Sequence, residues 1–128
     1  MAKSIIASPK VATFPGAPYS AGTKAGNLIF TAGMVAFNEK GELVGRGDIR
    51  AQTRQVLDNV KAIVEAGGGK MSDVVKTTVY ITDLANFAGM NEAYKTYFPS
   101  APPARATVKA DLVNKDFLVE IEAFAVIG

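Results

Sequence analysis

The chain has 128 residues, 48% hydrophobic and 20% charged, which is typical of one globular domain covering residues 1–128. Its 14 Lys and Arg residues against 12 Asp and Glu residues leave a net charge of +2, too small to indicate binding to nucleic acid or to an anionic membrane. Cys and His are absent, which excludes disulfides, thiolate nucleophiles, Ser–His–Asp triads and the usual zinc sites, so we expect no metal and no cofactor.

The N-terminal region is expected to carry no targeting signal. The apolar run within residues 1–10 is too short for a signal peptide. No stretch approaches the roughly 18 apolar residues that would span a membrane, so we expect a cytoplasmic protein without membrane contact. Residues 8–26 are rich in Pro, Gly, Ala and Ser and predict a long loop, which in a compact domain tends to carry function. Residues 27–31 predict a strand that bends at Ala32-Gly33.

The strongest helix signal follows Asp48, a good N-cap. Apolar residues recur at helical spacing from Ile49 to Val64, and the glycines at 67–69 stop the helix. The opposite face of this helix is expected to be polar and solvated, with Arg50, Arg54, Gln55, Asp58, Asn59 and Lys61.

The second half of the chain predicts a strand at 74–81, a helix between Asp83 and Pro99, and strands at 104–110 and 118–126 joined by a turn. The aromatic residues of that helix have helical spacing and are interpreted as core; they are Phe87, Tyr94, Tyr97 and Phe98. The order of elements is β(β)αβαββ, an α+β fold with helices on a sheet.

Charged residues alternate along the last two strands. Alternation places Arg105, Thr107 and Lys109 on one face of their strand, and Glu120 and Glu122 on one face of theirs. If the two strands pair as a hairpin, cations and carboxylates lie opposite each other. Two interpretations stay open. The pattern alone favours a solvated face with ion pairs. In the alternative, the face lines a cleft in which Arg105 offers a planar fork to a carboxylate and a glutamate orients water.

Seven motifs along the chain together resemble the Rid family, also called YjgF, of small enamine and imine deaminases. The motifs are APYS at 17–20, FTAG at 30–33, AQTRQVLDNVK at 51–61, VKTTVY at 75–80, NEAY at 91–94, PAR at 103–105 and VEIEA at 119–123. The resemblance covers nearly the whole chain. It implies a chorismate-mutase-like fold and a homotrimer whose three subunits form a closed barrel, with a site in each cleft between subunits.

The resemblance also assigns roles to single residues. It implies that Arg105 binds the substrate's carboxylate and that Glu120 positions water. Tyr19 and Asn91 are implied to line or shape the site, and Gly33 to present its backbone to the ligand.

This chain departs from the family pattern at three positions. Ala32 and Met34 replace the serine and glutamine of many members, so that wall of the site is expected to be less polar and softer. Thr107 stands where archetypal members carry a cysteine, and adds a small hydroxyl on the face of Arg105. These changes leave open whether this chain acts on the archetypal substrate of the family.

The implied activity is hydrolytic deamination of a small enamine or imine acid to a 2-keto acid and ammonia, as by a 2-iminobutanoate/2-iminopropanoate deaminase. One alternative is a specialised branch acting on 3-aminoacrylate or 2-aminomuconate. Another is a protein that binds small carboxylates or acts as a chaperone without catalysis. The ribonuclease label given to some relatives is disfavoured by the small net charge and the missing His.

Overall fold

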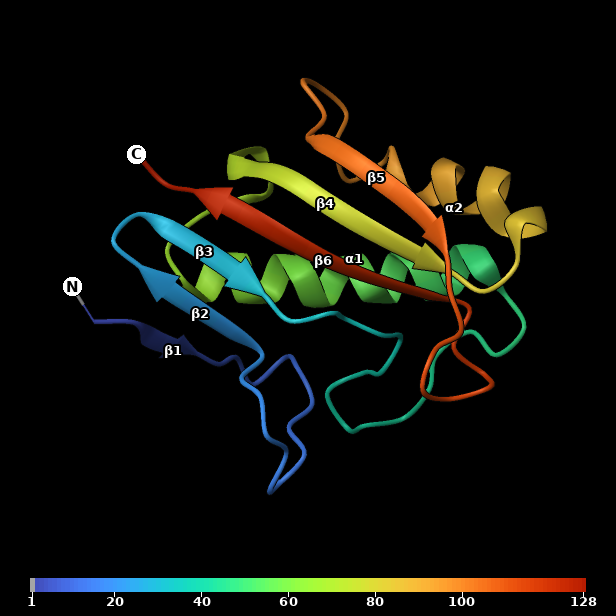
Figure 1. Cartoon of the computed structure of the whole chain (residues 1–128), viewed down its shortest axis with the longest axis horizontal. Helices are drawn as coiled ribbons and strands as arrows, with labels where there is room; N and C mark the ends of the chain where they lie inside the picture. Colours follow the sequence, from blue (N-terminus) through green and yellow to red (C-terminus); the bar gives the residue numbers. More distant parts are fainter. Residues whose placement is uncertain (1) are drawn as a thin grey trace.

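A six-stranded sheet forms the frame of the molecule in the computed structural model, which describes residues 2–128 (Figure 1). Its strands are β1 (Ser4–Ile6), β2 (Gly22–Ala25), β3 (Leu28–Thr31), β4 (Val74–Ile81), β5 (Ala104–Lys109) and β6 (Val119–Val126). Their order across the sheet is β1-β2-β3-β6-β4-β5. Neighbouring strands are antiparallel, except that β4 and β5 run parallel.

Two features of the sheet differ from the sequence-based expectation. The segment 8–26 is not all loop, because β2 lies within it and pairs with β1 and β3. The last two strands do not meet the condition of pairing as a hairpin, because β4 lies between β5 and β6 and pairs with both. The chain crosses from β4 to β5 through a helix, and such a crossover makes the two strands parallel neighbours.

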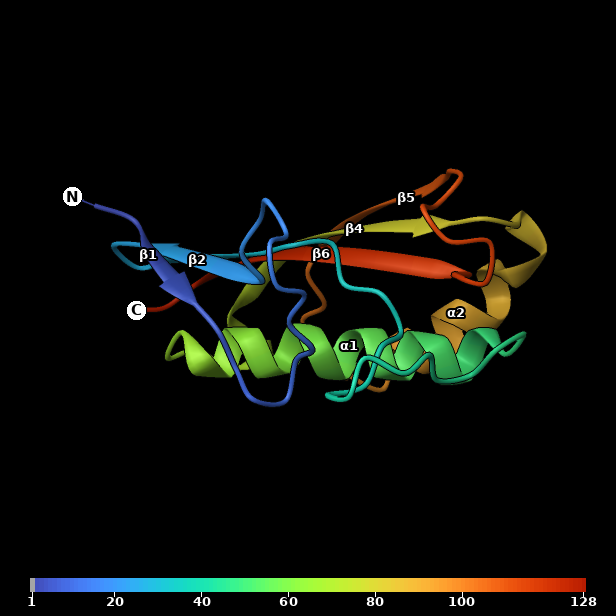
Figure 2. The same cartoon turned by 90° about the horizontal axis from the view of Figure 1, so that it is seen from below.

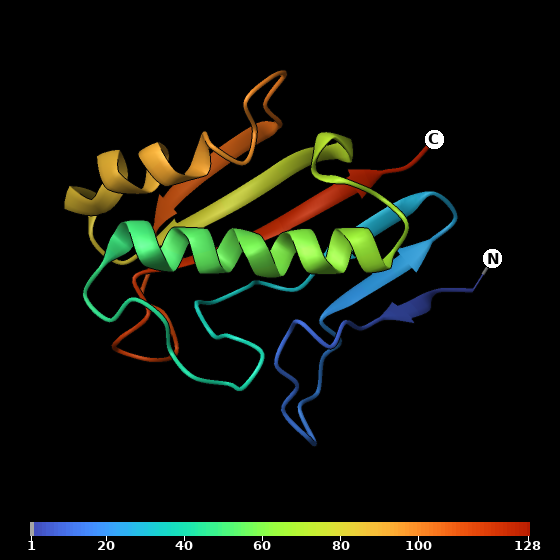
Figure 3. The same ribbon diagram turned by 180° about the vertical axis from the view of Figure 1, so that it is seen from behind.

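Both helices, α1 (Ile49–Ala66) and α2 (Phe87–Tyr94), cover the same face of the sheet (Figures 2 and 3). Short 3₁₀ turns, η1 (Met71–Asp73) and η2 (Leu84–Asn86), precede β4 and α2. In residues 2–128, no helix lies over the opposite face of the sheet. None of the helices in residues 2–128 has the length and apolar character needed to cross a membrane.

The ends of α1 follow the sequence signals. The Asp48 carboxylate accepts a hydrogen bond from the Ala51 amide at 3.1 Å, which satisfies one of the free N–H groups of the first turn. The helix ends at Gly67, and Gly68 takes a φ of +97°, a conformation that favours glycine. Asp83 caps η2 rather than α2, its carboxylate accepting from Ala85 N at 2.9 Å.

The apolar face of α1 packs on the sheet to form the core. Val56, Leu57, Val60 and Ile63 are fully buried, as are Val79, Val119 and Ile121 of the central strands. The polar face was predicted wrongly at one residue, since Asn59 is only 4% exposed. Its side-chain amide donates to the carbonyls of Val35 and Phe37 at 3.0 and 2.9 Å, so burial of the amide is compensated.

Candidate active site

Arg105 lies on the helix-covered face of the sheet, near its β5 edge. Its partner across the ladder is Thr77 of β4, which is fully buried and hydrogen-bonds the Tyr94 hydroxyl of α2 at 2.6 Å. Directly paired residues present their side chains to the same face. The Arg105 side chain therefore runs beneath α2, as its contacts with that helix also show.

The guanidinium of Arg105 is held without an acid. Its carbon lies 4.8 Å from the ring centre of Tyr94 and 5.7 Å from that of Phe87, and Nη1 donates to Asn91 Oδ1 at 2.7 Å. The ion pairs within residues 2–128 are Arg46–Asp116 and Arg50–Glu92, and neither involves Arg105. Aromatic faces stabilise and orient a guanidinium without neutralising it. This leaves a half-buried, positioned cation that lacks a counter-ion.

Thr107 shares the face of Arg105. It pairs with Val79, which like Thr77 is fully buried on the helix side, and its side chain is half-buried. Asn91 reaches Arg105 from α2. The predicted grouping of Asn91, Arg105 and Thr107 is thus present in one chain, and we call these three residues the arginine half-site.

Glu120 lies on the opposite, uncovered face. It pairs with Tyr80 of β4, three residues from Thr77 and hence on the other side of the pleat. Its carboxylate lies directly over the backbone of Gly33. A methyl group added there would overlap Oε2 and come within 2.9 Å of Cδ. Only a residue without Cβ lets the carboxylate rest in this position.

The neighbourhood of Glu120 disfavours its charge. Burial raises the pKa of the Glu120 carboxyl above its ordinary value, and the nearby charge of Glu122 raises it further. Tyr80 donates its hydroxyl proton to Glu122 Oε1 at 2.9 Å, and this bond is the main reason that the pKa of Tyr80 is also raised. A carboxylate with a raised pKa is a better proton acceptor than an ordinary one.

Tyr19 and Gly33 lie with Glu120. All three line one hollow of about 530 Å³, and the Tyr19 side chain is 61% exposed. We call Tyr19, Gly33 and Glu120 the glutamate half-site. The structure does not bring this half-site together with the arginine half-site in one chain. Arg105 and Glu120 do not lie opposite each other, as they could in a hairpin, because their strands are not neighbours and their side chains occupy opposite faces.

Met34 is largely buried, although it also lines a smaller hollow with Tyr19, Ala32 and Gly33. Met34 N donates to Ile121 O at 2.8 Å and Ile121 N donates to Met34 O at 3.1 Å, so the two residues share a face. Ile121 points into the core, and Met34 with it is only 5% exposed. Met34 is therefore mainly a core residue, while Ala32 and Gly33 border the hollow beside Glu120.

Sequence reasoning missed several residues of the site. Phe87 is 42% exposed rather than core, and Tyr94 is core and also supports Arg105 with its ring. The hollow beside Glu120 is walled by Phe14, Phe37, Val113 and Phe117, which come from three loops. The helical spacing of Phe87 and Tyr94 suggested that both belong to the core. The four residues from the loops have no periodic spacing, so no sequence pattern marked them.

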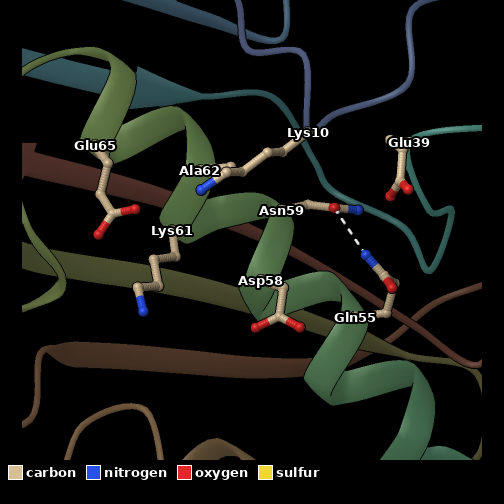
Figure 4. A pocket seen from close by; sticks show the side chains of 8 residues that line it. All are labelled: Lys10, Glu39, Gln55, Asp58, Asn59, Lys61, Ala62 and Glu65. Carbon is tan, nitrogen blue, oxygen red and sulfur yellow. Dashed lines mark hydrogen bonds between the residues drawn. The ribbon is translucent and has the colours of Figure 1, made fainter.

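A separate polar hollow lies over the outer face of α1 (Figure 4). Lys10 and Glu39 approach it from loops, while Asp58, Lys61 and Glu65 project from the helix. Two cations and three carboxylates line it together, which is typical of a solvated helix face. It contains no residue of either half-site.

The chain is similar to known proteins in sequence and in fold. A family model described as Endoribonuclease L-PSP matches residues 10–127. A RutC family protein of Pyrococcus horikoshii is 52% identical over 112 residues, covering 87% of this chain and 88% of that protein. The structure of the YjgF gene product from E. coli is 44% identical with a TM-score of 0.90, covering 98% of this chain and 99% of that one. The structure of E. coli TdcF with bound serine is 39% identical with a TM-score of 0.89, covering 98% and 99%.

Proposed function

The chain belongs to the endoribonuclease L-PSP family, which includes the YjgF and Rid proteins, and from this premise we propose that it is a hydrolytic deaminase of small imine and enamine acids. The observation that carries the proposal is the uncompensated guanidinium of Arg105, positioned by aromatic rings and by Asn91. A half-buried cation without an acid partner favours an anionic ligand.

A carboxylate fits this cation best. The planar fork of a guanidinium binds two carboxylate oxygens at once, which fixes the orientation of the ligand as well as its position. Nη1 already donates to Asn91, so the side chain is oriented before the ligand arrives. The related TdcF was solved with bound serine, which is a small amino acid with such a carboxylate.

Glu120 supplies the second function. Its raised pKa makes it a general base for a water molecule above Gly33. The water oxygen bonds to the imine carbon while Glu120 accepts a water proton, the C=N π electrons move to nitrogen, and the protonated Glu120 returns that proton to the nitrogen. Glu120 then carries the hydroxyl proton of the amino alcohol to the nitrogen, the C=O bond forms, the C–N bond breaks and ammonia leaves, so imino acid plus water yields 2-keto acid plus ammonia. An enamine first tautomerises to the imine.

Catalysis by this route requires a second copy of the chain. The two half-sites lie on opposite faces of one sheet, so one molecule of substrate reaches both only where two subunits meet. We propose a homotrimer in which each cleft takes the arginine half-site from one subunit and the glutamate half-site from the next. The uncovered face of the sheet, with exposed Leu28, Phe124 and Val126, supplies apolar surface for that contact.

Complementation between two inactive variants tests the proposal. Arg105→Ala and Glu120→Gln are each purified alone and then assembled together as mixed oligomers. Each variant alone should release ammonia from 2-iminopropanoate at no more than about a tenth of the wild-type rate. The mixture should recover about a quarter of wild-type turnover, because each cleft draws one half-site from each of two randomly chosen chains. No recovery would mean that one chain supplies the whole site.

Other functions give different results in the same assay. A binding protein or chaperone would hydrolyse no imine while still binding small carboxylates. A specialised branch would prefer 3-aminoacrylate or 2-aminomuconate to 2-iminopropanoate. The description of the family model as an endoribonuclease predicts RNA cleavage that Glu120→Gln abolishes; the small net charge of +2 disfavours this function.

A further inference from the structure

An apolar groove adjoins the glutamate half-site, and the mechanism above does not use it. Phe14, Phe37, Val113 and Phe117 wall a hollow of about 530 Å³ whose charged lining residue is Glu120. We call these four residues the aromatic groove. Two of them are unusually open to solvent, since Val113 is 95% and Phe14 44% exposed. Covering such surface with an apolar group is favourable.

The groove has a defined shape because its rings pack on one another. Phe37 lies between the other two rings, with centroid distances of 5.6 Å to Phe14 and 5.2 Å to Phe117. Phe117 is only 4% exposed and anchors this stack to the core. Aromatic pairs at such distances hold each other in tilted or edge-on arrangements. The wall is therefore present before a ligand binds.

Two buried amides of α1 hold the loops that carry these rings. Asn59 donates to the carbonyls of Val35 and Phe37. Gln52, which is fully buried, donates to the carbonyls of Gly45 and Asp116 at 3.2 and 2.9 Å and accepts from Leu118 N at 2.9 Å. Both loops are thus attached to the longest helix of the molecule, directly beside the aromatic residues.

We propose that the aromatic groove binds the side chain of the substrate, so that imino acids with a branched or aromatic side chain are preferred to 2-iminopropanoate. This inference rests on the proposed deaminase function and adds the substrate class. The water activated by Glu120 must reach the imine carbon, and the groove begins at Glu120 and Gly33. The side chain borne by the neighbouring carbon then lies against the rings rather than in water.

The preference is measured with imines made in place. An L-amino-acid oxidase produces them from alanine, leucine and phenylalanine in the presence of semicarbazide, which traps any imine that the protein has not hydrolysed. The kcat/KM for the leucine- and phenylalanine-derived imines should exceed that for the alanine-derived imine by about tenfold, the lower end of what one added apolar group contributes in a fitted pocket. Phe14→Ala should remove most of this difference, by lowering kcat/KM for the leucine- and phenylalanine-derived imines more than for the alanine-derived imine.

A second pair of variants guards against misfolding. Val113→Ala removes two methyl groups from a side chain that is almost fully exposed, so it leaves folding unaffected and should still lower the preference for leucine. Val75→Ala is the matched control, because Val75 is 50% exposed on β4 outside the groove. The control should match wild type with all three imines.

The outcomes separate this inference from the proposed function. Equal rates for the three imines, unchanged in Phe14→Ala and Val113→Ala, would overturn the groove while the deaminase stands. If no imine is hydrolysed, the deaminase fails, and binding of pyruvate and 4-methyl-2-oxopentanoate decides the groove: tighter binding of the larger acid supports it, and equal binding overturns it. A Phe14→Ala chain that loses its oligomeric mass would assign the groove to subunit contact and overturn the inference.

Discussion

The two half-sites are built in different ways. The arginine half-site stands on β5 and α2, and its three residues fall within a short stretch of sequence from Asn91 to Thr107. The glutamate half-site stands on the central strand β6 and on loops that begin as far away as Tyr19. In Figure 1 the loops of residues 7–21, 32–48 and 110–118 lie in the lower part of the view, whereas β5 and α2 lie in the upper part.

Their electrostatics are opposite. Arg105 is a cation that lacks an acid, whereas Glu120 is a carboxylate whose pKa is raised by burial and by a second carboxylate, Glu122. Each half-site holds the charge that the other lacks. This complementary charge supports the proposal that a ligand shared between two subunits completes both half-sites. The following predictions separate the contribution of each half-site.

The largest effect is expected for Glu120→Gln. Loss of a general base should lower kcat by about 100-fold, the lower end of the usual contribution, while KM and carboxylate binding change little. The pKa of Glu120 is raised on folding, so its ionised form opposes folding above that pKa, and the neutral amide should leave the melting temperature unchanged or slightly higher. Turnover and thermal unfolding of the same sample check both statements. A large drop in melting temperature would assign Glu120 a structural role.

Arg105→Ala and Arg105→Lys should both reduce kcat/KM by at least about tenfold, since a charge-assisted hydrogen bond contributes about 1.5–3 kcal/mol. Lysine keeps the charge but loses the planar fork and the stacking on Tyr94. Lys109→Ala is the matched control, because Lys109 is an exposed cation on the same face of β5. If Arg105→Ala turned over substrate at a near-normal rate, the site would be refuted and a solvated polar face would remain.

Gly33→Ala should lower kcat by about tenfold through displacement of the Glu120 carboxylate. The added methyl group would occupy the space of Oε2. Because the change leaves Arg105 untouched, the dissociation constant of a 2-keto acid should stay near the wild-type value. Calorimetric titration with pyruvate beside the rate assay distinguishes this from general misfolding, which would weaken both.

Glu122→Gln should change the pH profile rather than the plateau rate. Burial is the larger cause of the raised pKa of Glu120, and the charge of Glu122 is the smaller one. Removing the charge of Glu122 therefore lowers the pKa of Glu120. The active form has Glu120 ionised, and kcat/KM falls as the pH drops through its pKa. The acid limb of the profile should therefore move to lower pH, while the rate at neutral pH stays within about twofold. An unmoved limb would exclude Glu120 as the titrating base.

Removal of metal ions should have no effect. The chain contains neither Cys nor His, and carboxylates alone favour weak, hydrated sites for hard cations. Extended dialysis against a chelator should leave the deaminase rate unchanged. A loss that a divalent cation restores would show that a metal, not Glu120 alone, activates the water.

Much of the arginine half-site was visible in the sequence. Alternation along 104–110 placed Arg105 with Thr107, and the helical spacing of the preceding segment placed its aromatic residues on one side. The glutamate half-site was harder to predict. Without the family resemblance, it was indicated by the shared face of Glu120 and Glu122 and weakly by the loop phenol of Tyr19. Tyr19 and Gly33 come from irregular segments in which side-chain direction follows no period.

By itself, the sequence determined the elements and their local faces. Asp48 and the glycines at 67–69 bounded the long helix, and β-branched residues marked β4, because capping and propensity act within a few residues. The missing Cys and His excluded whole classes of chemistry.

Only the tertiary structure decided how the faces relate to one another. Alternation orders side chains within one strand, but not which face of the sheet each set occupies. The insertion of β4 between β5 and β6, with its register, put Arg105 beneath α2 and Glu120 on the uncovered side. It also buried Asn59, since only the folded chain brings the carbonyls of Val35 and Phe37 to that amide. Long-range pairing of this kind depends on backbone groups distant in sequence, which no local pattern records.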